Sequence, residues 1–120
     1  MNADSALFDF YNSFEIPAFP ETAVPDDAKM PYITYTFAIS ALDEGEVYLN
    51  ASIWYKTESE KIPTEKAMEI YERIGRGGIV LPLDSGYLWL KRGSPFAQSM
   101  PDEDNSVKLR YLNITAEYLT

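Results

Sequence analysis

The sequence predicts an α+β domain, in which a mostly antiparallel sheet of about five strands carries one main helix and a short N-terminal helix. Three observations lead to this class. Two stretches place apolar residues at helical spacing, and five others are β-branched, aromatic or alternating. The elements follow in the order α-β-β-α-β-β-β, so helices and strands are segregated. The length of 120 residues fits a single domain spanning 1–120.

Residues 2–14 predict the short N-terminal helix. Its apolar side chains fall at i, i+3, i+4 and i+7 on one helical face: Leu7, Phe10, Tyr11 and Phe14. Three polar residues near the start are suited to capping the first turn: Asn2, Asp4 and Ser5. Residues 15–27 contain three prolines, and we expect an extended linker there rather than a helix.

Residues 32–39 predict the first strand. One face should point into the core, with Ile33, Tyr35, Phe37 and Ile39. The other face is half-polar and suits solvent or a protein interface: Tyr32, Thr34, Thr36 and Ala38. Residues 47–56 predict a second strand, whose inward face is Val47, Leu49, Ala51, Ile53 and Tyr55. The turn at 41–46 contains Gly45 and predicts a hairpin between the two strands.

The main helix is predicted at residues 62–78. Its buried stripe comprises Ala67, Ile70, Tyr71 and Ile74. Pro63 suits the first turn, and the glycines at 75, 77 and 78 suit the end. The spacing of Glu69 with Arg73 and of Glu72 with Arg76 predicts two ion pairs on its surface.

Three strands are predicted in the last third of the chain, at residues 79–83, 87–93 and 107–120. Pro82 should place the first of them at an edge of the sheet. The last alternates throughout, and its inward side chains are Leu112, Ile114, Ala116 and Tyr118. Between them, residues 94–106 contain two prolines and an acidic cluster, and predict a long polar loop.

Composition excludes several kinds of function. The chain has no cysteine and no histidine, which removes disulfides, thiolate sites and the commonest general base. We therefore expect a non-enzymatic protein without a cofactor or a bound metal. The net charge is -9, and residues 1–60 hold eleven acids against two bases, which argues against a large DNA-binding surface. The N-terminus lacks the features of a signal peptide, so we expect a cytoplasmic protein that does not enter a membrane.

Three charged or glycine-rich motifs have a structural interpretation as well as a functional one. The acidic clusters at 26–27, 43–46 and 102–104 suggest metal binding, but Val107 stands where a calcium loop needs glycine, so solvated loops are favoured. The glycines at 75–78 follow a helix and predict its end rather than a phosphate site. The bases Lys91, Arg92, Lys108 and Arg110 could bind nucleic acid or an acidic partner. We favour the structural interpretation, in which these bases lie at exposed ends of neighbouring strands. There they could pair with the acidic half, residues 1–60, of a neighbouring copy.

Four phrases of the sequence resemble the tail-terminator and tail-completion proteins of long-tailed phages and prophages, over nearly the whole chain. They are LFDFYNSFEIPAF, AVPDDAKMPYITYTF, the helix with its following strands PTEKAMEIYERIGRGGIVLPLDSGYLWLKRGSPFAQ, and VKLRYLNITAEY. The best marker is the first strand entered through a proline, Pro31–Tyr35.

The resemblance implies a structural protein that caps the head-proximal end of the tail tube as a ring, commonly a hexamer. Its implied partners are other copies of itself, the major tail tube protein and the head connector or head-closure protein. Genomic DNA would pass through without specific binding. The implied location is the bacterial cytoplasm during assembly and then the tail–neck junction of the virion. The candidate interface residues are Tyr32, Thr34, Thr36, Lys91, Arg92, Asp102, Glu103 and Asp104.

Other functions remain open from the sequence. The nearest alternative is another neck protein, such as a head-closure or minor capsid component. A small acidic binding module, an enzyme working with carboxylates and tyrosines, and an acidic mimic of DNA are the others. An enzyme would need a concave polar site with paired carboxylates of raised pKa.

Overall fold

Helix α1 (Ala3–Tyr11) begins at the predicted cap, because the Asn2 side chain accepts a hydrogen bond from Ser5 N at 2.8 Å. A 3-10 turn, η1 (Asn12–Phe14), continues it and ends at Glu15, whose φ is 71°. The predicted apolar stripe is buried, which confirms this element. The structure is a computed structural model, and it describes residues 2–38 and 45–119.

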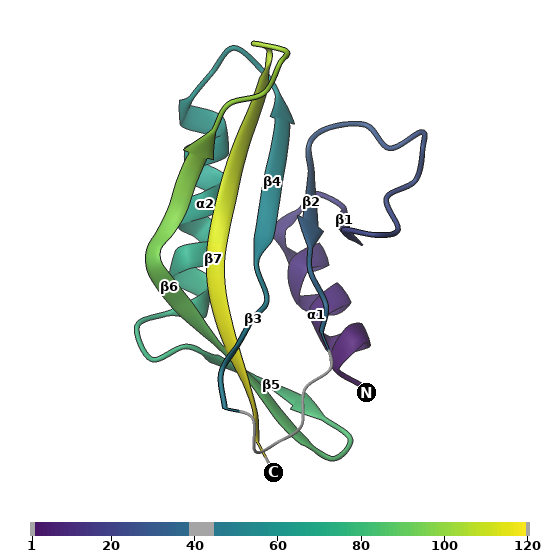
Figure 1. The fold of residues 1–120 in the computed structure, drawn as a ribbon, viewed down its shortest axis with the longest axis vertical. Coiled ribbons are helices and arrows are strands. Elements are labelled where there is room, and N and C mark those ends of the chain that lie inside the picture. Colours follow the sequence, from purple (N-terminus) through teal and green to yellow (C-terminus); the bar gives the residue numbers. More distant parts are fainter. Residues whose placement is uncertain (1, 39–44, 120) are drawn as a thin grey trace.

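The strands of the described residues form one mixed sheet, shown in Figure 1. They are β1 (Ala18–Pro20), β2 (Tyr32–Tyr35), β3 (Val47–Tyr48), β4 (Ala51–Lys56), β5 (Ile79–Leu83), β6 (Gly86–Met100) and β7 (Val107–Leu119). Their order is β1-β2-β4-β7-β6-β5, and β3 also pairs with β7. The sheet therefore has seven strands and is mixed, because β1 pairs with β2 in parallel, whereas we predicted a mostly antiparallel sheet of about five.

The additional strand β1 lies in the proline-rich segment predicted to be a linker. It is a short edge strand, and a proline occupies an edge without costing a ladder hydrogen bond. Its register is held from both ends, because Ile33 N donates to Pro17 O at 2.9 Å and Glu21 N donates to Tyr35 O at 2.8 Å. The linker prediction was therefore wrong for Ala18–Pro20.

The predicted strand 47–56 is divided by Asn50. The Asn50 side chain accepts from Ile114 N at 3.2 Å and donates to the Tyr111 hydroxyl at 2.7 Å, so an amide replaces part of the backbone ladder with β7. The hairpin with β2 is confirmed in register, with Tyr32 opposite Trp54. The turn predicted at 41–46 and the inward position of Ile39 fall largely outside the described residues.

The largest correction concerns the predicted loop 94–106. Residues up to Met100 continue β6, and only residues 101–106 connect it to β7. The two strands shift register between Arg92 and Ala97, and the Asn113 amide spans this bulge by donating to Pro95 O at 2.8 Å and Gln98 Oε1 at 3.0 Å. Strand β5 pairs only with the first part of β6, so the second part, which contains Pro95, lies at an edge of the sheet. An edge tolerates both proline and polar side chains.

Helix α2 (Lys61–Ile74) packs across β4, β6 and β7, and its predicted stripe is buried apart from the partly exposed Tyr71. The predicted ion pairs Glu69–Arg73 and Glu72–Arg76 do not form among the described residues. Glu69 instead accepts from Lys66 at 3.0 Å, and Arg73 Nη1 donates to the Ser13 hydroxyl at 3.1 Å. Arg73 also lies 4.7 Å above the Phe14 ring, so it joins α2 to η1. No described helix is long and apolar enough to cross a membrane.

The core lies between the helices and one face of the sheet. Tyr35 of β2 stacks on Tyr11 of α1 with ring centroids 5.0 Å apart, and the inward residues of the last strand, Leu112, Ile114 and Ala116, are buried. Phe37 was predicted to join this core, but it is 38% exposed because β2 ends at Tyr35.

Candidate interaction surfaces

One face of the sheet carries both helices, and no described element covers the other. Cross-strand pairing fixes which side chains share a face, since directly opposed residues point the same way. Buried Ile33 is opposite Ile53, and buried Leu112 is opposite Ala51, so these residues face the helices. Their chain neighbours must face away. Figure 1 looks onto this uncovered face, with α1 and α2 behind the strands.

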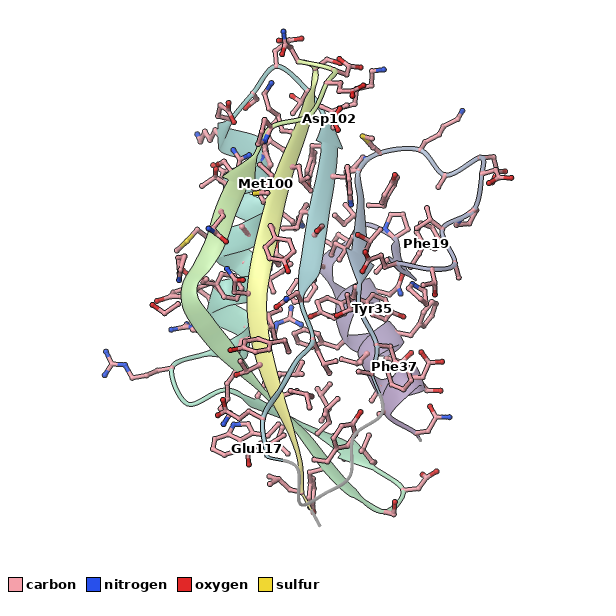
Figure 2. The ribbon with its side chains drawn as sticks, viewed as in Figure 1. Phe19, Tyr35, Phe37, Met100, Asp102 and Glu117 are labelled. Carbon is pink, nitrogen blue, oxygen red and sulfur yellow. The ribbon has the colours of Figure 1, made fainter. Side chains whose placement is uncertain are left out.

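Two rows of side chains cross the uncovered face, the first over five strands and the second over four. In the first, Phe19, Thr34, Ser52, Tyr111 and Gln98 lie opposite one another in turn. In the second row, Tyr32, Trp54, Leu109 and Met100 lie opposite one another in turn. We call these nine residues the uncharged face, because none of them is ionisable near neutral pH. Figure 2 shows Phe19 and Met100 near its opposite margins.

The uncharged face is internally ordered. The Tyr32 ring lies between Phe19 and Trp54, with centroids 6.0 and 6.3 Å away. The Trp54 indole donates to the Thr34 hydroxyl at 3.0 Å, which leaves Thr34 only 8% exposed. Thr36 lies just beyond β2, where its hydroxyl and its backbone N–H both donate to Asn50 O. Rigid aromatic side chains bury area at little entropic cost, and charged residues are depleted from interface cores. The face therefore has the chemistry of a protein-binding surface.

Three of the predicted interface residues thus belong to one region: Tyr32 and Thr34 lie on the uncharged face, and Thr36 lies beside it. A hollow of about 190 Å³ adjoins them, lined in part by Glu21, Asn50 and Tyr111. The predicted interface residues did not include three other members of this face, Trp54, Tyr111 and Met100. The signal for the first two was present, because each alternates with core residues of its own strand. Met100 was missed because its segment was assigned to a loop.

The four basic residues predicted as one cluster lie in separate environments. Lys91 is on the uncovered side, where it pairs with Glu46 and, at 2.8 Å, with Glu117, and lies 4.3 Å from the Trp89 ring. The hydrogen bonds that Lys91 donates to Glu117 and to Glu46 raise the pKa of Lys91. Its partner in the acidic half is therefore in the same chain.

The other three bases turn towards the helix side. Arg92 Nε donates to Tyr71 O at 2.9 Å, and its guanidinium lies 3.4 Å above the Tyr71 ring. Arg110 is 6% exposed and holds the start of α2, donating to Glu60 Oε1 at 2.7 Å and to Glu60 O at 3.2 Å. Lys108 donates to Asn105 O. These contacts are structural, and the four residues do not form one basic patch.

The acidic residues Asp102, Glu103 and Asp104 occupy the turn between β6 and β7. Asp104 accepts from both the hydroxyl and the N–H of Ser106, and these hydrogen bonds lower the pKa of its carboxyl group. Asp102 accepts from Asp104 N at 3.1 Å. This turn is ordered by its own side chains. Within residues 2–38 and 45–119, no group of histidine, cysteine, aspartate or glutamate is arranged to hold a metal ion, and Asp43 and Glu44 lie outside these ranges.

The two ends of the sheet differ in what they offer a partner strand. At β1, the Asn12 side chain accepts from Ala18 N at 3.0 Å and donates to Ala18 O at 3.2 Å, so an amide occupies the position of a further strand. At the other end, β6 beyond Leu90 has no strand partner on its outer side among the described residues. Pro95 and the bulge interrupt that edge, as at other protected strand edges.

Comparison with solved structures finds this fold elsewhere. A chain in the virion of a native gene transfer agent particle superposes with a TM-score of 0.64 and 15% sequence identity, covering 99% of this chain and 87% of that one. No protein-family model matches the sequence. No curated protein matches it either. The likeness shows a shared fold over essentially the whole chain.

Proposed function

We propose that this protein is a non-enzymatic structural protein of a phage or prophage, which caps the head-proximal end of the tail tube as a ring and joins the tail to the head. The observation that carries the proposal is the fold shared with a virion chain over 99% of the sequence. The resemblance of the sequence phrases to tail-terminator proteins points in the same direction and supports a position at the tail–neck junction.

The arrangement of the surfaces supports assembly. A ring requires two unlike patches that repeat around an axis. The uncharged face provides one surface from which water can be excluded without desolvating a charge. A protein of net charge -9 needs such a region if copies are to meet closely, because elsewhere like charges repel. We assign the uncharged face to contact with protein and the acidic loops to surfaces that face DNA without binding it.

The partners proposed are further copies of this chain, the major tail tube protein and the head connector or head-closure protein. Assembly would take place in the bacterial cytoplasm and end in the virion. A head-closure or minor capsid component is the second candidate, because it would use the same kind of surface at a neighbouring position in the neck.

The test is capping of tail tubes, observed by negative-stain electron microscopy. We expect rings with a central opening at one end of each tube for the wild-type protein. Met100→Glu places a charge on the uncharged face and should reduce the capped fraction at least tenfold. Met68→Glu is the matched control, since Met68 is 48% exposed on α2 and Met100 is 45% exposed on β6. Tubes with bare ends in the presence of wild-type protein would exclude the capping role.

A further inference from the structure

The glycine-rich turn after α2 presents one arginine to solvent. Gly75 and Gly78 have φ values of 80° and 86°, and Gly78 N donates to Gly75 O at 3.2 Å, which closes a tight turn around Arg76. The Trp89 indole donates to Gly77 O at 2.8 Å and holds the turn against β6. Arg76 is exposed at the outside of this turn.

Arg76 has an unusual status among the ten basic residues. Eight of them bond or pair within the chain, and in the described part of the structure only Arg76 and Lys29 have no hydrogen-bond or ion-pair partner. A guanidinium held on a fixed turn loses little conformational freedom when it binds, so it is well suited to a specific contact.

An acidic hollow with an aromatic floor lies between α1 and β2. Its volume is about 440 Å³, and it is lined by Asp4, Glu21, Tyr35 and Phe37 among others. A second hollow shares Asp4 and Tyr35 and adds Asp9 and Phe8. We call the two together the acidic hollow. Figure 2 shows Tyr35 and Phe37 along the same segment beside α1.

The carboxylates of the acidic hollow have no ion-pair partner among the described residues. They belong to Asp4, Asp9 and Glu21. The Tyr35 side chain is 1% exposed, and its hydroxyl has no hydrogen-bond partner in residues 2–38 and 45–119. Phe8 and Phe37, by contrast, are 46% and 38% exposed beside the carboxylates.

This combination suits a guanidinium group. Carboxylates accept paired N–H groups from arginine, and exposed aromatic rings attract its planar cation. A lysine ammonium matches the charge but neither the paired donors nor the flat surface. The acidic hollow therefore selects an arginine.

The two features lie on opposite flanks of the molecule. In Figure 1 the turn between α2 and β5 projects from one side, while α1, β1 and the start of β2 form the other. Opposite placement of complementary patches is the geometry of a head-to-tail contact, which closes into a ring when the rotation allows. Lys29 lies in the connection between β1 and β2, on the same flank as the acidic hollow, so it is badly placed for this role.

We propose that Arg76 of one copy enters the acidic hollow of the next copy, where it binds the carboxylates of Asp4 and Glu21 over the ring of Phe37. This contact rests on the proposed ring and gives neighbouring copies a second pair of contacting surfaces besides the uncharged face. The glycine turn then has a binding role in addition to ending α2.

Charge reversal tests the contact through the solution mass, measured by light scattering after size-exclusion chromatography. Arg76→Glu should weaken ring assembly at least tenfold, and Glu21→Arg in the same chain should recover most of the loss. Lys29→Glu is the matched control, because it makes the same charge change at the other unpartnered base, and it should leave assembly unchanged. Equal assembly of wild type and Arg76→Glu would overturn the contact.

Cross-linking gives a second and independent measurement, helped by the absence of native cysteine. Gly77→Cys sits in the turn with open space around its β-carbon, and Thr22→Cys sits on the rim of the hollow. The double variant treated with a short bismaleimide should give a ladder of oligomers that stops at the ring size, and each single variant should not. A ring of normal mass without a ladder would overturn the Arg76 contact and leave the capping role standing. A protein that stays monomeric on tail tubes would remove both.

Discussion

The rings of Tyr11 and Tyr35 stack 5.0 Å apart between α1 and β2, and neither hydroxyl has a hydrogen-bond partner among the described residues. This pair joins the N-terminal helix to the first central strand. Its two rings contribute a large buried apolar area, while its two hydroxyls oppose burial. The site is therefore a place where the monomer can be made more stable.

Tyr35→Phe should raise the free energy of unfolding of the monomer by about 1 kcal/mol, because it removes a buried hydroxyl that nothing satisfies. Urea denaturation at a concentration where the protein is monomeric measures this. Tyr118→Phe is the control, because the Tyr118 hydroxyl donates to Ala38 O at 2.9 Å and its loss should lower stability by about 0.5 kcal/mol. A loss of stability in Tyr35→Phe would show that its hydroxyl is satisfied in solution.

The same pair predicts sensitivity to alkali. Burial, and then the Asp4 carboxylate, raise the pKa of Tyr35 to about 12, and burial also raises the pKa of Tyr11. An unfolded tyrosine ionises at about pH 10, so above that pH the unfolded chain loses protons that the folded protein keeps. The stability due to neutral tyrosine should be complete below about pH 10 and fall as the pH approaches 12.

Urea unfolding at a series of alkaline pH values would measure this loss. The double variant Tyr11→Phe with Tyr35→Phe should show a shallower fall than the wild type. Curves of equal slope would mean that other groups cause the alkaline unfolding.

Arg110→Ala should lower the free energy of unfolding by about 2 kcal/mol. The Arg110 side chain is 6% exposed, and its guanidinium connects β7 to the start of α2 through Glu60 O and the Thr64 hydroxyl at 3.3 Å. Lys108→Ala, two residues earlier on the same strand, should change stability by less than about 0.5 kcal/mol. Thermal or urea unfolding of both variants measures the difference, and similar losses would contradict the structural role given to Arg110.

Gly78→Ala should be strongly destabilising, by about 2 kcal/mol or more. Its φ of +86° disfavours a side chain, and a β-carbon there would stand 2.5 Å from Leu90 O and from the Trp89 indole nitrogen. Gly77→Ala meets nothing within 4 Å and should be neutral or slightly stabilising. Circular dichroism melts of the two variants distinguish them, and equal melting temperatures would contradict the tight turn around Arg76.

Much of this fold follows from local patterns. The helical spacing of Leu7, Phe10 and Phe14 and the alternation of Leu112, Ile114 and Ala116 each reflect one face buried against the core, and both elements are found as predicted. The strands at the edges of the sheet were harder to predict. β1 and the second half of β6 contain prolines that normally argue against a strand, and only their position at the margin of the sheet makes them possible.

The surfaces could be predicted only in part. The positions of Tyr32 and Thr34 on the outward face were predicted correctly, because inward and outward side chains alternate along β2. The rows across the sheet depend on register between strands far apart in sequence, such as Ser52 opposite Tyr111, which no local pattern contains. The separation of Lys91 from Arg92 was visible in principle, since adjacent residues of a strand face opposite ways.

Light scattering on a size-exclusion column would show whether copies of this protein assemble through the uncharged face. The solution mass of the wild-type protein is measured at two concentrations, beside the Met100→Glu and Met68→Glu variants. We expect one closed oligomer, a hexamer, for wild type and Met68→Glu, and a shift towards monomer for Met100→Glu. A discrete oligomer that forms equally well with a glutamate on the uncharged face, or a wild type that is monomeric at both concentrations, would contradict the claim that this face joins copies into a ring.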